Sequence, residues 1–158
     1  CRIAFFYSEP WKNIASSAAT MPFASSKKLG ARIDWIKIVE KKALNMKVSD
    51  LVNELSLTVF SGQAGLDHDV TGGYTSDLLS DVMGNVDEGQ VWITLQTHRN
   101  IMAVASLKEV AAVILVKGLE PAADTMVQSH EEGIPLLGTS LEAFEISGRL
   151  YQLLNPRG

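Results

Sequence analysis

The sequence contains a single cysteine, at position 1, and no long apolar run. One cysteine excludes an internal disulfide framework and a zinc site built from cysteines, and it suits a reducing cytoplasm. No stretch approaches the roughly 20 apolar residues that a membrane-spanning helix needs, so membrane insertion is not predicted. With 158 residues, 46% of them hydrophobic and 20% charged, the chain is expected to fold as one domain with an N-terminal extension.

The two parts of the chain carry opposite net charges: residues 1–45 have few acidic residues, and residues 46–158 have few basic ones. Residues 1–45 hold eight Lys or Arg against three acidic residues, a net charge of +5, whereas residues 46–158 hold six against fifteen, a net charge of −9. Because an acidic domain repels phosphate backbones, nucleic-acid binding is not predicted. Residues 1–45 carry no recognisable motif and are interpreted as an extension of uncertain origin. Met46 would make a natural initiator, so the domain is assigned to residues 46–158.

The motifs of several enzyme classes are also missing. No Gly-x-x-x-x-Gly-Lys-Ser/Thr run is present, so no backbone cradle for phosphates can be assigned. The three histidines, at positions 68, 98 and 130, fall in separate segments, which disfavours a metal site. Ser76 and His98 could be imagined as a nucleophile and its base, but no pattern joins them. The sequence therefore predicts no cofactor, no metal and no catalytic activity.

From Met46 onward, apolar patterns of strand length alternate with patterns of helical period. Strands are expected at residues 57–60, 70–75, 90–95, 112–116 and 134–137, and helices at 48–55, 76–84, 97–108, 121–133 and 139–154. Connections this short imply right-handed crossovers between parallel strands. The predicted fold class is therefore α/β, a small and mainly parallel sheet with helices on both faces.

Local signals predict how some of these elements begin and end. Ser76 is expected to cap the helix that follows it, with Gly84 just past its end. Thr139 and Glu142 have the spacing of a capping box. The adjacent glycines 72–73 permit a positive φ, a bulge, or close approach of another backbone or a ligand, and the bulge is the favoured interpretation.

Polar and basic residues follow three of the predicted strands. Ligands gather at the carboxyl ends of parallel strands, where helix N-termini offer backbone N–H groups. A small anionic ligand could be held there; alternatively, Thr97 only caps a helix, and Arg99 and Lys117 are solvated or paired with acidic residues. The candidate ligand-binding residues are Gly72, Gly73, Ser76, Gln96, Thr97, His98, Arg99, Lys117 and Thr139.

Five segments resemble the DRTGG-domain family in order and spacing, over about residues 46–154: DVTGGYTSDLLSDVMGN, VWITLQTHRNIMAVASL, AAVILVKG, EEGIPLLGTS and AFEISGRL. Members of this family are small α/β modules attached to phosphotransacetylases, CBS-containing pyrophosphatases and P-loop proteins. Copies that stand alone are commonly labelled as relatives of HPr serine kinase. The resemblance implies regulation and dimerisation rather than chemistry. Many members have Gly-Asp-Arg where this sequence has Thr97-His98-Arg99, so only the arginine is kept.

The sequence thus predicts a non-catalytic regulatory or partner-docking module that forms a homodimer in the cytoplasm. The alternative is a sensor that binds a nucleotide or another small anion at the strand ends near His98 and Arg99. Phosphoryl transfer related to HPr kinase is the third and least supported hypothesis, because the phosphate-binding loop is missing.

Overall fold

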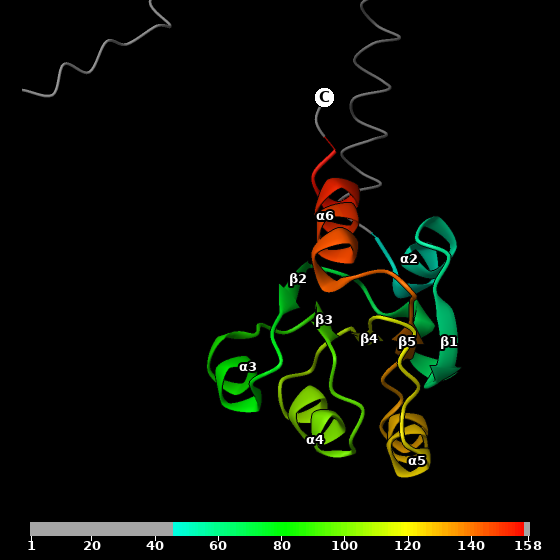
Figure 1. Cartoon of the computed structure of the whole chain (residues 1–158), viewed down its shortest axis with the longest axis vertical. Helices are drawn as coiled ribbons and strands as arrows, with labels where there is room; N and C mark the ends of the chain where they lie inside the picture. The colour runs from blue at the N-terminus through cyan, green and yellow to red at the C-terminus, as the bar shows by residue number, and fades with distance from the viewer. Residues whose placement is uncertain (1–45, 157–158) are drawn as a thin grey trace, which may run out of the picture. The chain divides into compact units, whose positions relative to one another are not determined.

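The computed structural model describes residues 46–156, and the predictions for residues 1–45 lie outside this part. The described residues form five α-helices, one 3-10 helix and a five-stranded sheet (Figure 1). The elements are α2 (Val48–Glu54), β1 (Thr58–Ser61), η1 (Gln63–Asp67), β2 (Gly72–Thr75), α3 (Leu79–Asn85), β3 (Gln90–Thr94), α4 (Asn100–Leu107), β4 (Ala112–Leu115), α5 (Ala123–Glu132), β5 (Leu136–Gly138) and α6 (Ala143–Leu154).

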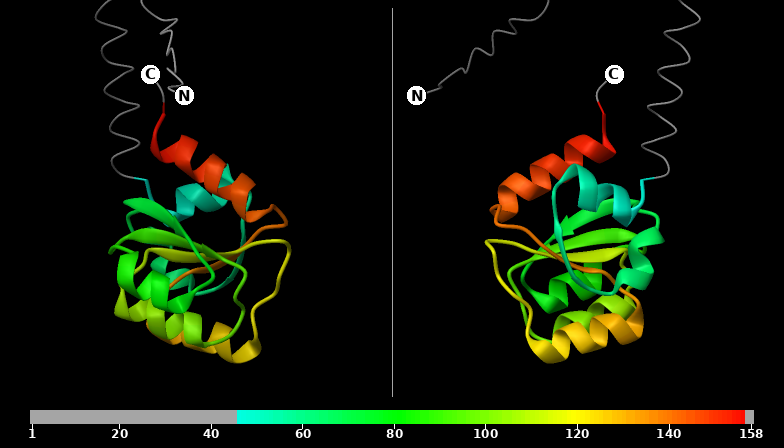
Figure 2. Two further views of the ribbon diagram at one scale, coloured as in Figure 1. Left: turned by 60° about the vertical axis from the view of Figure 1, so that its left-hand side comes forward. Right: turned by 90° about the vertical axis from the view of Figure 1, so that its right-hand side faces the viewer.

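The sheet has the strand order β1-β5-β4-β3-β2. Strands β2 to β5 are parallel, and β1 pairs with β5 in the antiparallel direction. Because β2 to β5 lie side by side in chain order, right-handed crossovers place α3, α4 and α5 on the same face of the sheet. Helices α2 and α6 cover the opposite face (Figures 1 and 2). The predicted α/β class, with a mainly parallel sheet and helices on both faces, is confirmed.

The apolar runs of the strands are buried on both faces of the sheet. On β3, Val91 and Ile93 belong to the core under α2 and α6, whereas Trp92 belongs to the core under α3 and α4. On β4, Ile114 and Val113 divide in the same way. This alternation explains why neither strand shows the apolar and polar period of a half-exposed strand.

The two predicted helix caps, at Ser76 and at Thr139, do not form. The Ser76 hydroxyl accepts the Leu78 N–H at 3.3 Å in the turn before α3, and the helix begins only at Leu79 without a side-chain cap. The Thr139 hydroxyl accepts the Leu141 N–H at 3.2 Å, and α6 begins at Ala143, so no capping box forms. In both places the hydroxyl forms a tight turn at a strand end, which competes with the cap for the same short-range hydrogen bond.

Glycines 72–73 form regular strand rather than the predicted bulge. Gly73 lies opposite Val91 in unbroken parallel register, and neither glycine has a positive φ. A Cβ atom on Gly73 would lie 2.7 Å from Cδ2 of Leu150 in α6. Close approach of the Leu150 side chain, rather than of another backbone or a ligand, therefore explains why a glycine fits at position 73.

Candidate functional site

The chain direction changes at the carboxyl ends of β4 and β5. The loop after β4 leads to α5 on one face of the sheet, and the loop after β5 leads to α6 on the other face (Figure 1). Adjacent parallel strands whose loops leave to opposite faces normally open a crevice that binds ligands. The topology therefore places the expected binding site between residues 116–122 and residues 139–142.

This crevice is bridged by the two loops themselves. The Lys117 N–H donates to the Leu141 carbonyl at 2.9 Å, and the Gly118 N–H donates to the Thr139 carbonyl at 2.8 Å. Lys117 and Gly118 have φ values of 60° and 66°, the left-handed conformation. The Lys117 ammonium also lies 3.1 Å from the Glu142 carboxylate. Lys117 and Thr139, two of the predicted ligand-binding residues, thus take part in contacts between the loops.

Asp77 joins the loop after β2 to the end of β3. Its carboxylate accepts the Thr94 hydroxyl at 2.8 Å and the Leu95 N–H at 2.7 Å. The side-chain amide of Gln96 donates to the Asp77 carbonyl, and the Trp92 indole donates to the Ser76 carbonyl at 2.8 Å. Sequence reasoning selected Ser76 and Gln96 but not Asp77. The available signal was an acidic side chain in the turn directly after a strand.

Thr97 connects the β3–α4 loop to the start of α5. Its carbonyl accepts the Ala122 N–H at 3.2 Å and the hydroxyl of buried Thr125 at 2.9 Å. Its hydroxyl does not cap α4, which begins at Asn100 with no side-chain cap. The loops after β2, β3, β4 and β5 are thus fastened to one another or to the element beside them.

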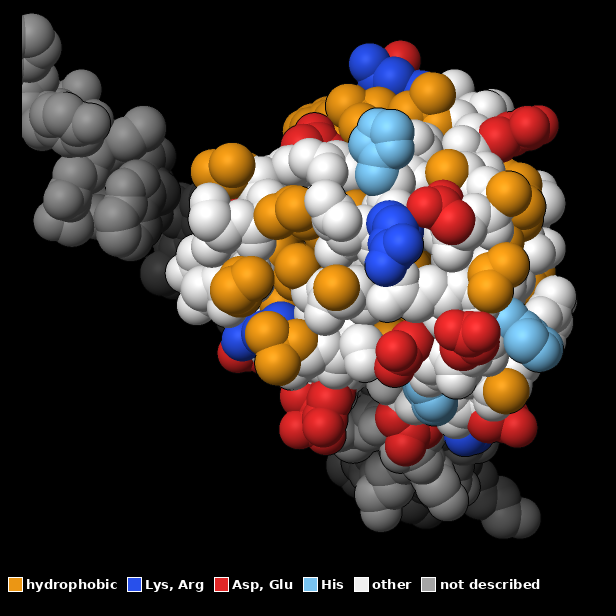
Figure 3. All heavy atoms as spheres, turned by 90° about the horizontal axis from the view of Figure 1, so that it is seen from below, with side chains coloured by type: hydrophobic (Ala, Val, Ile, Leu, Met, Phe, Trp, Pro, Cys, Tyr) orange, Lys and Arg blue, Asp and Glu red, His pale blue; other side chains and the backbone are white. Residues whose placement is uncertain are grey.

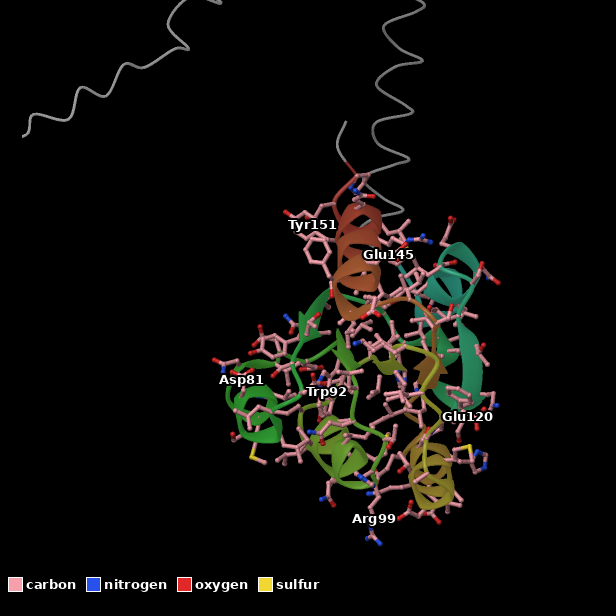
Figure 4. The ribbon with its side chains drawn as sticks, in the orientation of Figure 1. Asp81, Trp92, Arg99, Glu120, Glu145 and Tyr151 are labelled. Carbon is pink, nitrogen blue, oxygen red and sulfur yellow. The ribbon has the colours of Figure 1, made fainter. Side chains whose placement is uncertain are left out.

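His98 and Arg99 are exposed at the start of α4. Figure 4 shows Arg99 pointing away from the sheet at the far end of the molecule from α6. Arg99 borders a hollow of about 370 Å³, on whose α5 side lie Asp124, Glu131 and Glu132. Three carboxylates beside one guanidinium oppose the binding of an anion there. Arg99 therefore faces α5, whereas Lys117 faces Glu142.

Gly72 and Gly73 lie away from this edge, in a hollow of about 400 Å³ between edge strand β2 and helix α6. Ser147, Leu150 and Tyr151 form the helical side of this hollow. Gly72 and Gly73 are therefore separated from the strand-end residues with which they were grouped as candidate ligand-binding residues.

The hollow at the amino ends of the strands has a volume of about 890 Å³ and is acidic. Asp67, Asp69, Glu88, Glu109 and Glu132 contribute to its lining. Among residues 46–156, no group of three or more His, Cys, Asp or Glu side chains is arranged to hold a metal ion. We assign no ligand to this hollow.

A hydrogen-bond network joins β2 to α3. The Tyr74 hydroxyl donates to Oδ2 of Asp81 at 2.8 Å, and this hydrogen bond raises the pKa of Tyr74 above its ordinary value. Hydrogen bonding with Ser76, and then with Tyr74, lowers the pKa of Asp81. The side-chain amide of Asn85 also donates to Asp81 at 3.0 Å. The network gives the hydroxyl of partly buried Tyr74 a hydrogen-bond partner. Because the pKa of Tyr74 is raised and the pKa of Asp81 is lowered, neither pKa moves toward neutral pH, where a general acid or base works best.

Large apolar side chains are exposed on helices of both layers. On α6, Phe144 is 93% exposed and Tyr151 is 64% exposed. On the other layer, Figure 3 shows apolar side chains on the α3 side of the face and also on its opposite side, with acidic side chains among them. Leu78 and Met83 are 63% and 48% exposed there.

Comparison with known proteins identifies a similar fold. No family model matches the sequence, and no curated protein matches it. The chain is similar to the CBS and DRTGG domains of the regulatory region of Clostridium perfringens pyrophosphatase, solved with the activator diadenosine tetraphosphate, with a TM-score of 0.57 and 16% identity. The match covers 82% of this chain and 57% of that one.

At this identity the likeness shows the fold alone, and it agrees with the DRTGG-like architecture expected from the sequence. The similar protein is a regulatory region rather than a catalytic domain. None of the helices within residues 46–156 has both the length and the apolar composition needed to cross a bilayer.

Proposed function

We propose that this chain is a non-catalytic regulatory or partner-docking module of the cytoplasm that acts as a homodimer, with residues 46–158 as the module. One observation carries this proposal: the strand-end crevice is occupied by contacts between its own loops, while large apolar side chains lie outside. A substrate entering between β4 and β5 would have to replace the hydrogen bonds of Lys117 and Gly118 and the ion pair with Glu142. The likeness to a regulatory region supports the same proposal.

A second candidate function is a sensor that binds a nucleotide or another small anion near His98 and Arg99. Two observations favour it: both side chains are exposed, and the similar structure was solved with a nucleotide activator. The acidic residues of α5 beside Arg99 weigh against it. We therefore place the sensor second.

Thermal unfolding of the 158-residue chain with adenine and guanine nucleotides, phosphate and Mg²⁺ separates the two candidates. A ligand at about 100 times its Kd stabilises the native state by roughly 2.7 kcal/mol, which raises Tm by several degrees. The docking module predicts no rise with any of these ligands. A rise that disappears in Arg99→Ala but persists in Lys108→Ala would establish the sensor instead.

A nucleotide-turnover assay tests the absence of catalysis in the same samples. The proposal predicts no release of phosphate or diphosphate above the rate without protein. Turnover that follows the protein through purification and is lost in Arg99→Ala would contradict it.

A further inference from the structure

Helix α6 presents an aromatic stripe to solvent. Phe144 and Tyr151 are 93% and 64% exposed, whereas Ile146 and Leu150 on the opposite side are buried. At about 100° per residue, positions 144, 148 and 151 fall within about 60° of one another around the helix. The stripe therefore consists of Phe144, Gly148 and Tyr151. Figure 4 shows the Tyr151 ring pointing away from the ribbon of α6.

Gly148 lies between the two aromatic residues, in the middle of an exposed helix. A Cβ atom there would meet nothing within 4 Å in the part of the chain that the structure describes. The packing of this part therefore does not require glycine, which destabilises a helix interior relative to alanine. A missing side chain on the outward face lets a second backbone approach closely.

We propose that α6 packs antiparallel against α6 of a second copy, about a two-fold axis that passes near Ser147 and Gly148. This inference rests on the proposed homodimer and assigns its interface. In such a pair, positions equally far from the axis face each other. Phe144 of each copy then faces Tyr151 of the other, and the two Gly148 backbones meet beside the axis.

The charges of α6 are complementary to the same arrangement. Glu145 and Arg149 flank the stripe on one side and form an ion pair at 2.7 Å within the helix. They lie on either side of the same axis, so the two-fold operation brings each carboxylate toward the guanidinium of the other copy. A second copy of α6 therefore matches both the aromatic and the charged positions.

The hollow between β2 and α6 lies beside the aromatic stripe and could receive a side chain of the second copy. It has a volume of about 400 Å³, and Tyr151 forms part of its lining. Because Phe144 of the second copy faces Tyr151, its ring lies at the mouth of this hollow. Four aromatic side chains contribute roughly half of the ~1,200 Å² that a small specific interface buries. We therefore expect a dimer that dissociates on dilution.

Sedimentation velocity of the 158-residue chain between micromolar and millimolar concentrations measures this dimer. Phe144→Ser and Tyr151→Ser should each raise the dimer Kd at least tenfold. Leu107→Ser and Val127→Ser alter side chains on the opposite layer that are 68% and 58% exposed, and they should leave the Kd unchanged. All four positions are exposed, so circular dichroism should confirm an unchanged fold.

A charge-exchange experiment tests the register of the pair. Glu145→Arg and Arg149→Glu each place like charges across the axis, so each variant alone should dimerise several-fold more weakly than the parent. An equimolar mixture should restore association, because the heterodimer pairs arginine with glutamate at both crossings. The repulsion within each helix is unaffected by mixing, so recovery reports contacts between copies.

The outcomes separate this interface from the function on which it rests. A chain that stays monomeric at every concentration would overturn both the homodimer and the α6 interface. A dimer that tolerates Phe144→Ser, or a mixture no tighter than its components, would overturn the α6 interface alone. Recovery in the mixture together with weakening by both aromatic substitutions would establish it.

Discussion

Removing the Asp77 carboxylate should loosen the carboxyl edge of the sheet. Asp77→Ala deletes the acceptor for the Thr94 hydroxyl and the Leu95 N–H, at 2.8 and 2.7 Å. Hydrogen bonds to a charged group contribute about 1.5–3 kcal/mol each. Two such bonds would contribute about 3–6 kcal/mol. Because Asp77 is exposed and water replaces part of the loss, we expect a smaller destabilisation, about 2–4 kcal/mol in total. For a domain of this size, that corresponds to a fall in Tm of roughly 6–15 °C.

Differential scanning calorimetry with two matched variants checks this reasoning. Both hydrogen bonds are accepted by Oδ1 of Asp77, so Asp77→Asn keeps the accepting oxygen and removes only the charge. Because neutral hydrogen bonds are weaker than charged ones, Asp77→Asn should lose about half as much stability. Glu120→Ala removes an exposed acid from the loop after β4, and it should change Tm by less than about 2 °C. If Asp77→Ala lowered Tm no more than Glu120→Ala, the hydrogen bonds of Asp77 would not hold the edge together.

Two further predictions concern stability. Gly62 has a φ of 72°, and a Cβ atom there would lie 2.2 Å from the Ile134 carbonyl oxygen, so Gly62→Ala should cost roughly 3 kcal/mol or more in chemical denaturation. Gly84→Ala, on an open surface of α3, should instead stabilise by roughly 0.5–1 kcal/mol, and equal effects at the two glycines would refute the steric argument. Hydrogen bonding with Ser76 and then Tyr74 lowers the pKa of Asp81 from 3.8, so its stabilising contribution is present at neutral pH and is lost as the pH falls through the lowered pKa. Asp81→Asn should therefore flatten the acid side of a plot of Tm against pH, and an unchanged slope would contradict this assignment.

Much of the fold was readable from apolar patterns. The apolar runs at residues 90–95 and 112–116 predicted strands, and β3 and β4 lie there, buried on both faces of the sheet. Gly133 was expected to end a helix, and it closes α5 with a φ of 67°. These predictions succeeded because burial acts on whole segments, and segment length and period are written in the sequence.

The candidate site was less readable because it depends on which loops meet. Arg99 and Lys117 both follow strands, yet one faces the acidic residues of α5 and the other pairs with Glu142. The role of Asp77 was missed because its partners lie 17 and 18 residues away. That the candidate ligand-binding residues bind one ligand together remains a prediction.

The sequence by itself determined the α/β class, the position of each strand and the acidic character of the domain. Only the tertiary structure decided that the strand-end loops bridge one another and that Phe144 and Tyr151 lie on the outer side of α6. The physical reason is the distance along the chain over which each kind of interaction acts. Period and composition act between residues a few positions apart, whereas a hydrogen bond between two loops, or the exposure of one helix face, depends on the packing of the whole sheet.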